Sequence, residues 1–356
     1  MNSLLLAPEL FLREGGIARI LRLYLKGLCE ISGEGDRVRF VALNDKDVDS
    51  SELRRYSDAH LTEWDACNRS KVAFARAALR LGSRTDRIIC GHIGQLPVAW
   101  AAAAIRPKLR YYLVAHGIEV WRPFTFLEQL ALRRARRILC VSEFTRQQVL
   151  NHSRLPPERA AVLFNALDPG LNPTSANPPP KTPPVILSVS RLSIADNYKG
   201  IQHLISAMPA VHGRIPDARL RIVGRGDGMP GLQSLVRKLN LNASVEFAGY
   251  RSDAELGKDF DGCRLFALPS KKEGFGLVYL EAMAHGRPCL GARSGGVPEV
   301  INADSGILAD YGDIEGIAGA IVSALGRNWA IEPLLERARM FSYPIFRERL
   351  AALLSE

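Results

Sequence analysis

The stretch LFALPSKKEGFGLVYLEAMAHGRPCLGARSGGVPEVI, residues 265–301, decides the fold of this chain. It alternates apolar runs typical of buried strands with glycine-rich turns, and the first turn leads into a helical pattern. Strand, glycine turn and helix in this order form the repeating unit of a parallel α/β sheet. The unpaired N–H groups and positive dipole at the start of such a helix suit a phosphate or a sugar oxygen.

The same alternation extends along the rest of the chain. Strand-like runs occur at 3–7, 38–43, 86–91, 111–117 and 137–144, and again at 184–192, 219–224, 244–250, 263–270, 287–292 and 305–310. Between the two sets, residues 169–184 read PGLNPTSANPPPKTPP, where proline removes backbone donors and ends regular structure. The sequence therefore predicts two Rossmann-like domains, at 1–172 and 183–339. An amphipathic helix over 340–356 follows, with Ile345, Leu350 and Leu353 on related positions.

Composition and charge are those of a globular protein with a basic first half. The 356 residues are 47% hydrophobic and 24% charged, with a net charge of +10, and this length suits two hydrophobic cores. Residues 1–168 hold 26 Lys and Arg against 18 Asp and Glu. Such an excess attracts an anionic partner such as a membrane surface, a phosphorylated lipid or nucleic acid, although a well-hydrated surface is an equal alternative.

Cysteine usage and apolar runs indicate where the protein works. The six cysteines form no Cys-x-x-Cys pair, which predicts buried free thiols. The opening MNSLLLAPELFL has no basic residue before its apolar stretch, and the longest strongly apolar run, at 98–105, is short. We therefore expect neither a signal peptide nor a membrane span. A reducing cytoplasm fits both features.

Two glutamates in the opening stretch have the spacing of a nucleotide sugar. Glu273 and Glu281 are separated by about two helical turns, or ~12 Å, so one carboxylate can reach the sugar and the other the ribose. In this setting the chain resembles family 4 of the retaining glycosyltransferases, whose signature is Glu-x7-Glu in a strand-turn-helix. The matching residues are Glu273, Phe275, Gly276, Glu281, Ala282, Gly286, Pro288, Gly295, Gly296, Pro298 and Glu299.

The resemblance continues upstream at LSVSRLSIADNYKGIQHLI, where the family has an Arg and a Lys-Gly that bind the donor diphosphate. Arg191 and Lys199 match these positions. Two fixed cations can stabilise the charge that develops on the leaving diphosphate, as Mg²⁺ does elsewhere. The resemblance thus implies no metal and no cofactor beyond the nucleotide diphosphate sugar itself. The insert SIADNY between the two cations is longer than the commonest family pattern.

The resemblance also implies the remaining site residues. Four residues are expected in catalysis: His116, Arg191, Lys199 and Glu273. The donor-binding set is Gly15, Gly16, Gly224, Tyr250, Arg251, Gly274, Phe275, Gly276, Leu277 and Glu281. His116 would contact the transferred sugar; the alternative is a histidine that merely ends a buried strand. The family's Asn-Gly is replaced here by Asn165-Ala166.

What the resemblance implies as a whole is a GT-B fold. Its two Rossmann-like domains face each other across a cleft, with the C-terminal helix crossing back to the first domain. The implied reaction is metal-independent transfer of a hexose, with retention, to a hydroxyl of a glycan or lipid-linked saccharide. GDP-mannose is preferred as donor, then a UDP-hexose. The expected location is cytoplasmic and peripheral at the inner face of the plasma membrane, with Arg76/Arg80 and Arg133/Arg134/Arg136/Arg137 towards anionic lipid.

Other functions stay open or are excluded on particular residues. A nucleotide-sugar epimerase of similar fold would need a different carboxylate and histidine arrangement. A non-catalytic binding protein of this fold should lack one of Arg191, Lys199, Glu273 or Glu281, and all are present. A dinucleotide fingerprint at Gly224 lacks its third glycine, because Met229 occupies that position. Nucleic acid is not expected as a partner, since Ala and Leu rather than aromatic residues flank the arginine clusters.

Overall fold

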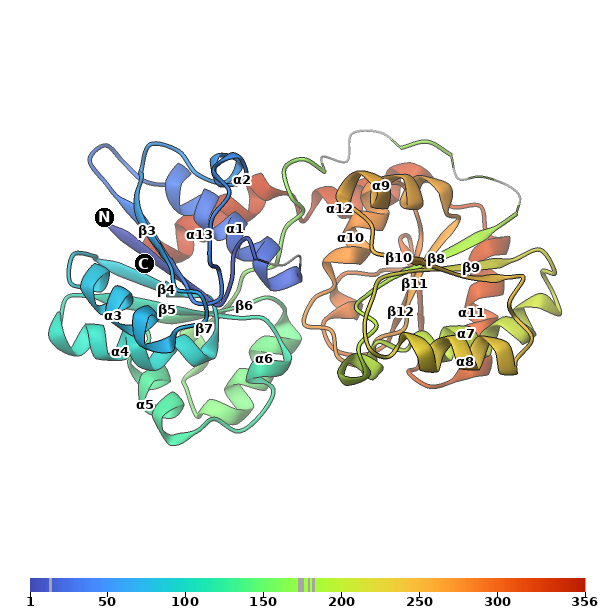
Figure 1. Cartoon of the computed structure of the whole chain (residues 1–356), viewed down its shortest axis with the longest axis horizontal. Helices are drawn as coiled ribbons and strands as arrows, with labels where there is room; N and C mark the ends of the chain where they lie inside the picture. The colour runs from blue at the N-terminus through green and yellow to red at the C-terminus, as the bar shows by residue number, and fades with distance from the viewer. Residues whose placement is uncertain (13–14, 172–175, 179, 181–182, 356) are drawn as a thin grey trace. The chain divides into compact units, whose positions relative to one another are not determined.

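The computed structural model describes residues 1–12, 15–171, 176–178, 180 and 183–355 and divides the chain into two compact units (Figure 1). The first unit is Met1–Asp168 together with Tyr343–Glu356, and the second is Pro169–Ser342. The divisions thus fall at 168/169 and 342/343: the first unit ends four residues before the expected 172, the second begins fourteen residues before the expected 183, and the return to the first unit comes three residues after the expected 340. Part of the proline segment, at 172–175, 179 and 181–182, lies outside the described residues.

The first unit is built on a seven-stranded parallel sheet with the order β3-β2-β1-β4-β5-β6-β7. Its strands are β1 (Ser3–Ala7), β2 (Val38–Ala42), β3 (Leu61–Ala66), β4 (Arg87–Cys90), β5 (Arg110–Ala115), β6 (Arg137–Cys140) and β7 (Ala160–Val162). The five predicted strands are confirmed, whereas β3 and β7 went unrecognised. Both are edge strands and only partly buried, so they lack the continuous apolar run of a central parallel strand.

Helices cover both faces of this sheet. They are α1 (Gly16–Glu30), α2 (Ser50–Arg55), α3 (Lys71–Gly82), α4 (Leu96–Ile105), α5 (Phe126–Arg134), α6 (Glu143–Ser153) and α13 (Tyr343–Ser355). Because side chains alternate along a strand, Leu5 of β1 packs into the core under α1 and α13. Leu4 and Leu6 pack into the core on the other face, under α3 and α4.

The C-terminal helix α13 returns to the first unit, as predicted, and packs against α1. Its buried face is Tyr343, Phe346, Leu350 and Leu354. The Phe346 ring lies edge-on to Tyr24 of α1 at 5.1 Å between centroids, and the Tyr343 hydroxyl donates to Glu30 Oε2 at 2.9 Å. The expectation that Ile345 shares the buried face is wrong. Ile345 is 37% exposed, because the buried positions are spaced by three and four from Tyr343 and pass it by.

The second unit repeats the design with six parallel strands in the order β10-β9-β8-β11-β12-β13. These are β8 (Val185–Val189), β9 (Arg219–Val223), β10 (Val245–Gly249), β11 (Leu265–Leu268), β12 (Cys289–Ala292) and β13 (Gly306–Ala309), and all six were predicted. This is the strand order of a doubly wound nucleotide-binding fold, and it reverses between β8 and β11. The predicted α/β class is confirmed in both units.

The helices of the second unit again form two layers. Helices α7 (Ile201–His212), α8 (Met229–Lys238) and α11 (Ile314–Gly326) lie on one face of the sheet (Figure 1). Helices α9 (Asp253–Gly262), α10 (Leu277–Ala284) and α12 (Ile331–Arg339) lie on the other. A 3-10 segment, η4 (Ile194–Lys199), precedes α7. It corresponds to the insert noted in the sequence.

All six cysteines are buried and free, as predicted. In the part of the chain that the structure describes, none of the helices combines the length and apolar character needed to cross a bilayer.

We expect replacement of Leu350 by Ala to destabilise the first unit by about 2–5 kcal/mol, because it leaves a cavity in a fully buried contact between α13 and α1. Ile345→Ala removes a similar side chain from an exposed position of the same helix and should change the free energy of unfolding by less than about 1 kcal/mol. Chemical denaturation of both variants measures the difference. Equal losses would mean that α13 is not docked in this orientation.

Candidate active site

The candidate site lies at the carboxyl ends of β8 and β11, the neighbouring strands between which the order of the second sheet reverses. In doubly wound sheets ligands bind at this switch point, because the loops leaving the two strands diverge to opposite faces. Arg191 lies on the loop after β8, and Glu273 lies on the loop after β11. The fold therefore brings together two predicted residues that are far apart in the sequence.

Arg191 is held at one edge of its side chain by an acid from the insert. Its Nε lies 3.2 Å from Asp196 Oδ2, and its Nη2 donates to Asp196 Oδ1 at 3.4 Å. The Arg191 side chain is 73% exposed, whereas that of Asp196 is 10% exposed. The guanidinium is thus anchored on the protein side and open on the solvent side.

Lys199 is the last residue of η4, and its ammonium group forms an ion pair with Glu273. The side chains are 18% and 14% exposed, so the pair is mostly shielded from water. Gly200, which follows η4, has φ +78° and packs closely against Pro269, the residue after β11. A Cβ at this position would lie only 2.3 Å from the Pro269 carbonyl oxygen. Despite the longer insert, the Lys199 side chain thus contacts Glu273, the first glutamate of the motif.

The two glycine turns of residues 265–301 brace each other. Gly296 N–H donates to the Glu273 carbonyl at 2.9 Å, and Ser294 Oγ donates to the Lys271 carbonyl at 2.7 Å. A Cβ on Gly295, whose φ is +62°, would lie 2.3 Å from that same Glu273 oxygen. Glycine is therefore required at this position, and the second turn fixes the backbone that carries Glu273.

Helix α10 begins at Leu277, directly after Gly276 at φ +98°. Gly274 lies in the turn before it, and the Phe275 side chain is buried against Phe341, with ring centroids 5.3 Å apart. Glu281 lies inside α10 and is only 7% exposed. The N-terminal end of α10 thus follows directly after the turn that carries Glu273.

Gly224, Tyr250 and Arg251 lie on the loops after β9 and β10. A Cβ on Gly224, at φ +139°, would lie 1.8 Å from the Ser190 carbonyl oxygen, so this glycine lets two loops touch. The Tyr250 side chain is 49% exposed, with the Arg225 guanidinium 4.9 Å from its ring centroid. The Arg251 Nε lies 3.3 Å from Oδ2 of Asp259 in α9. The positive charge of Arg251 is therefore already balanced by a carboxylate.

Gly15, Gly16 and His116 belong to the first unit. Gly15 precedes α1 and Gly16 is its first residue. His116 follows β5, is 9% exposed and donates from Nε2 to the Gly91 carbonyl at 2.9 Å, which leaves Nδ1 as an acceptor. Burial holds the pKa of His116 below its ordinary value, outweighing nearby Glu119. His116 does end a buried strand, and it is neutral at physiological pH.

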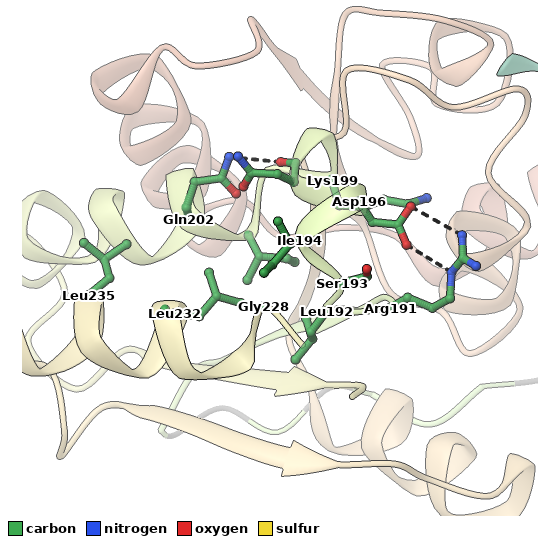
Figure 2. A pocket seen from close by; sticks show the side chains of 13 residues that line it. Arg191, Leu192, Ser193, Ile194, Asp196, Lys199, Gln202, Gly228, Leu232 and Leu235 are labelled. Carbon is green, nitrogen blue, oxygen red and sulfur yellow. Dashed lines mark hydrogen bonds and ion pairs between the residues drawn. The ribbon is translucent and has the colours of Figure 1, made fainter. Parts of the chain in front are cut away.

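A cavity of about 310 Å³ adjoins the site and shares Arg191, Asp196 and Lys199 with it (Figure 2). Its walls are η4, the start of α7 and helix α8, with Leu232 and Leu235 on the α8 side. Its lining residues include none from the Lys271–Glu273 turn. The cavity is therefore formed by η4 and the helices beside it, without the loop that carries Glu273.

The described parts of the chain contain no set of three or more His, Cys, Asp or Glu side chains placed to hold a metal ion.

Sequence reasoning missed the residues that hold the predicted ones. Asp196 and Tyr198 lie in the insert, which was noted only for its length, and Asp259 was not considered. Glu119 Oε1 accepts from the His116 N–H at 2.6 Å and the Gly117 N–H at 3.1 Å. Only the Asp-x-Tyr pattern next to Lys199 could have signalled such a role, because the other partners are set by tertiary contacts.

Comparison with known proteins identifies the family. The domain described as Glycosyltransferase Family 4 matches residues 14–171, and Glycosyl transferases group 1 matches residues 183–327. The GDP-mannose-dependent alpha-(1-6)-phosphatidylinositol monomannoside mannosyltransferase of Mycolicibacterium smegmatis is 30% identical over 322 residues, covering 77% of this chain and 80% of the relative. The chain belongs to glycosyltransferase family 4. As a member of this family it is a hexosyltransferase, as predicted.

A second relative of this family 4 glycosyltransferase matches over a shorter stretch. The N-acetyl-alpha-D-glucosaminyl L-malate synthase of Bacillus anthracis is 39% identical over 151 residues, 42% of this chain. That match spans only 39% of the relative's own length.

Solved structures confirm the predicted GT-B fold of this family 4 glycosyltransferase. Anabaena HepE in complex with UDP has a TM-score of 0.79 at 20% identity and covers 100% of both chains. The lipopolysaccharide outer core galactosyltransferase WaaB has a TM-score of 0.78 at 18% identity and covers 99% of both. At these identities the likeness concerns the fold.

We expect Gly295→Ala to lower sugar transfer at least tenfold, because its methyl group would displace the backbone that carries Glu273. Gly319 lies inside α11 with open space around a Cβ, so Gly319→Ala should leave activity unchanged and raise stability by up to about 1 kcal/mol. Initial rates and thermal unfolding of the two variants test this expectation. Wild-type activity in Gly295→Ala would show that the two turns are not coupled.

Proposed function

We propose that this family 4 glycosyltransferase moves a hexosyl unit, with retention of configuration, from a nucleotide diphosphate sugar to a hydroxyl of a glycan or lipid-linked saccharide. One observation carries the proposal: Arg191, three residues before η4, and Lys199, the last residue of η4, follow strand β8, and the glycine-initiated helix α10 follows the neighbouring strand β11. Two cations and a positive helix terminus at one place form a site for a diphosphate.

Each group then has a task in bond breaking. When the bond from the anomeric carbon to the diphosphate oxygen breaks, negative charge grows on the leaving group, and Arg191, Lys199 and the α10 N–H groups stabilise it. Lys199 has three N–H donors, so its pair with Glu273 leaves donors for phosphate. Glu273 orients the sugar hydroxyls and Glu281 the ribose. The leaving phosphate takes the proton of the acceptor hydroxyl, so the mechanism needs neither a protein nucleophile nor a metal.

The remaining predicted residues surround the donor in this proposal. Tyr250 and Arg251 adjoin the base, and Gly224 keeps their loop close to that of Arg191. His116, Gly15 and Gly16 act from the first unit, where Nδ1 of neutral His116 accepts a hydrogen bond from a hydroxyl of the transferred sugar. Closure of the site excludes water that would hydrolyse the donor.

The relatives support a choice of substrates. GDP-mannose is proposed as the donor, because the M. smegmatis relative is named a GDP-mannose-dependent enzyme and matches over 77% of this chain. A UDP-hexose is the second candidate, supported by the HepE complexes with UDP and with UDP-glucose. The phosphatidylinositol monomannoside in the name of the same relative supports a lipid-linked saccharide as the acceptor.

Removal of both cations tests the proposal. The wild type should bind GDP or UDP in calorimetry and transfer sugar in the presence of EDTA, whereas Arg191→Ala/Lys199→Ala should lose at least a hundredfold in kcat/KM. Arg237→Ala/Lys238→Ala removes the same two residue types from the exposed end of α8 and should leave kcat/KM unchanged. Retained transfer in the first variant, dependence on added metal, or nucleotide release without transfer to any acceptor would each contradict it.

An anionic membrane at the inner face of the plasma membrane is proposed as the surface on which the acceptor is met. The structure favours α5 over α3 for this contact. On α3, Arg80 forms ion pairs with Glu63 and, at 2.7 Å, with Asp65. The Arg80 charge is thus already balanced, and only Arg76 of the expected Arg76/Arg80 surface is left for anionic lipid. On α5, exposed Arg133 and Arg134 follow Phe126 and Leu127, which are 78% and 54% exposed.

We expect Arg133→Ala/Arg134→Ala to weaken binding to vesicles that contain phosphatidylglycerol at least tenfold at low salt, since each arginine near an anionic surface contributes about 1 kcal/mol. Arg214→Ala/Arg219→Ala removes the same net charge from exposed positions of the second unit and should bind like the wild type. Cosedimentation measures both. Equal binding of neutral and anionic vesicles by the wild type would eliminate the membrane contact.

A further inference from the structure

We propose that Asp196 is a positioning residue of the donor site, which holds the Arg191 guanidinium by one edge and leaves the opposite edge for the diphosphate. The inference rests on the proposed function and deepens it. Asp196 lies outside the residues that match the family motif, in the insert between Arg191 and Lys199.

In the Arg191–Asp196 pair, one edge of the guanidinium is bound to the carboxylate and the opposite edge is not. A guanidinium carries five N–H donors in a planar fork. Asp196 engages Nε at 3.2 Å and Nη2 at 3.4 Å, so Nη1 and the second hydrogen of Nη2 stay available. The acid is buried and the arginine is mostly exposed. The carboxylate therefore acts as the fixed partner and the guanidinium as the group presented to a ligand.

Asp196 is itself fixed, because the insert is tied down on both sides. The Tyr198 hydroxyl donates to Asp196 Oδ1 at 2.8 Å. Burial raises the pKa of Tyr198, and Asp196 raises it further, so the phenol keeps this proton throughout the physiological range. The Tyr198 carbonyl accepts from Lys271 N–H at 2.8 Å, next to Glu273 on the β11 loop. Ile194 N–H donates to Asp227 Oδ1 at 2.9 Å, on the β9 loop.

These contacts join the two donor-site cations through one short segment. Arg191 pairs with Asp196, Tyr198 holds Asp196, and Lys199 follows Tyr198 and pairs with Glu273. A long arginine side chain loses rotamer freedom when it binds a ligand. An arginine that is already held loses less, which favours binding.

The carboxylate also has an opposite effect, because its negative charge reduces the attraction of the site for an anion. The two effects predict opposite results for Asp196→Asn, which keeps the shape and removes the charge. If positioning dominates, a diphosphate binds this variant more weakly than the wild type. If Asp196 merely competes with the ligand, the variant binds more tightly.

Calorimetry with GDP and UDP, together with donor kinetics, tests the role. Asp196→Asn should lower affinity and kcat/KM about tenfold, and Tyr198→Phe, which keeps the ring, should lower them about threefold. In an Arg191→Ala background Asp196→Asn should cause no further loss, since a positioning residue contributes to binding only through its partner. Asp65→Asn is the matched control, because Asp65, on the edge strand β3 of the first unit, also pairs with an exposed arginine, Arg80 of α3. This variant should behave like the wild type.

The outcomes are distinguishable. Tighter or unchanged binding in Asp196→Asn, or an equal loss in the Arg191→Ala background, overturns the positioning role while the proposed function stands. A wild type that binds neither nucleotide overturns the proposed function, and the inference with it. Thermal unfolding checks that the variants are folded. If Asp196→Asn does not fold, Tyr198→Phe is used for the same measurements.

Discussion

Arg191 and Lys199, the two cations proposed to bind a diphosphate, have to be kept in place when no anion is bound, and this constraint shapes the second unit. Like charges left unpaired next to each other would repel and disorder the loops that carry them. Each cation is paired with one carboxylate, Arg191 with Asp196 and Lys199 with Glu273. The two pairs differ in exposure, since Lys199 is shielded and Arg191 is open. The two cations of the proposed donor site therefore already have their orientation before a ligand binds.

The strand order provides the place for these pairs. Because β8 and β11 are neighbours at the reversal point, the loops after them meet without long excursions. Glycine then allows the close approaches that any side chain would prevent, at Gly224 against Ser190, at Gly200 against Pro269 and at Gly295 against Glu273. The positions that look like a phosphate-binding signature in the sequence thus have a second, structural reason, which is contact between loops.

Much of this could be predicted from the sequence, and the limits have physical causes. Central parallel strands are buried on both faces and were recognisable as apolar runs. The edge strands β10 and β13 of the second sheet were recognised as well, whereas β3, which carries two acidic residues, and β7, which has only three residues, were not. Arg191, Lys199 and Glu273 were identified because they belong to a spaced motif. Asp196 and Asp259 were missed because an acidic residue near a loop has no signature until its partner is located. Ile345 was placed on the wrong face because its helix buries a narrow stripe that a short apolar pattern does not define.

Helix α13 closes the core of the first unit with the last residues of the chain. Ribosomal synthesis therefore delivers every strand and helix of the second unit before the first unit receives its final piece. Until then the apolar face of α1 that meets Phe346 and Leu350 has no cover. The N-terminal half of the nascent chain must wait in an incomplete state, an exception to the usual order in which domains fold as they emerge.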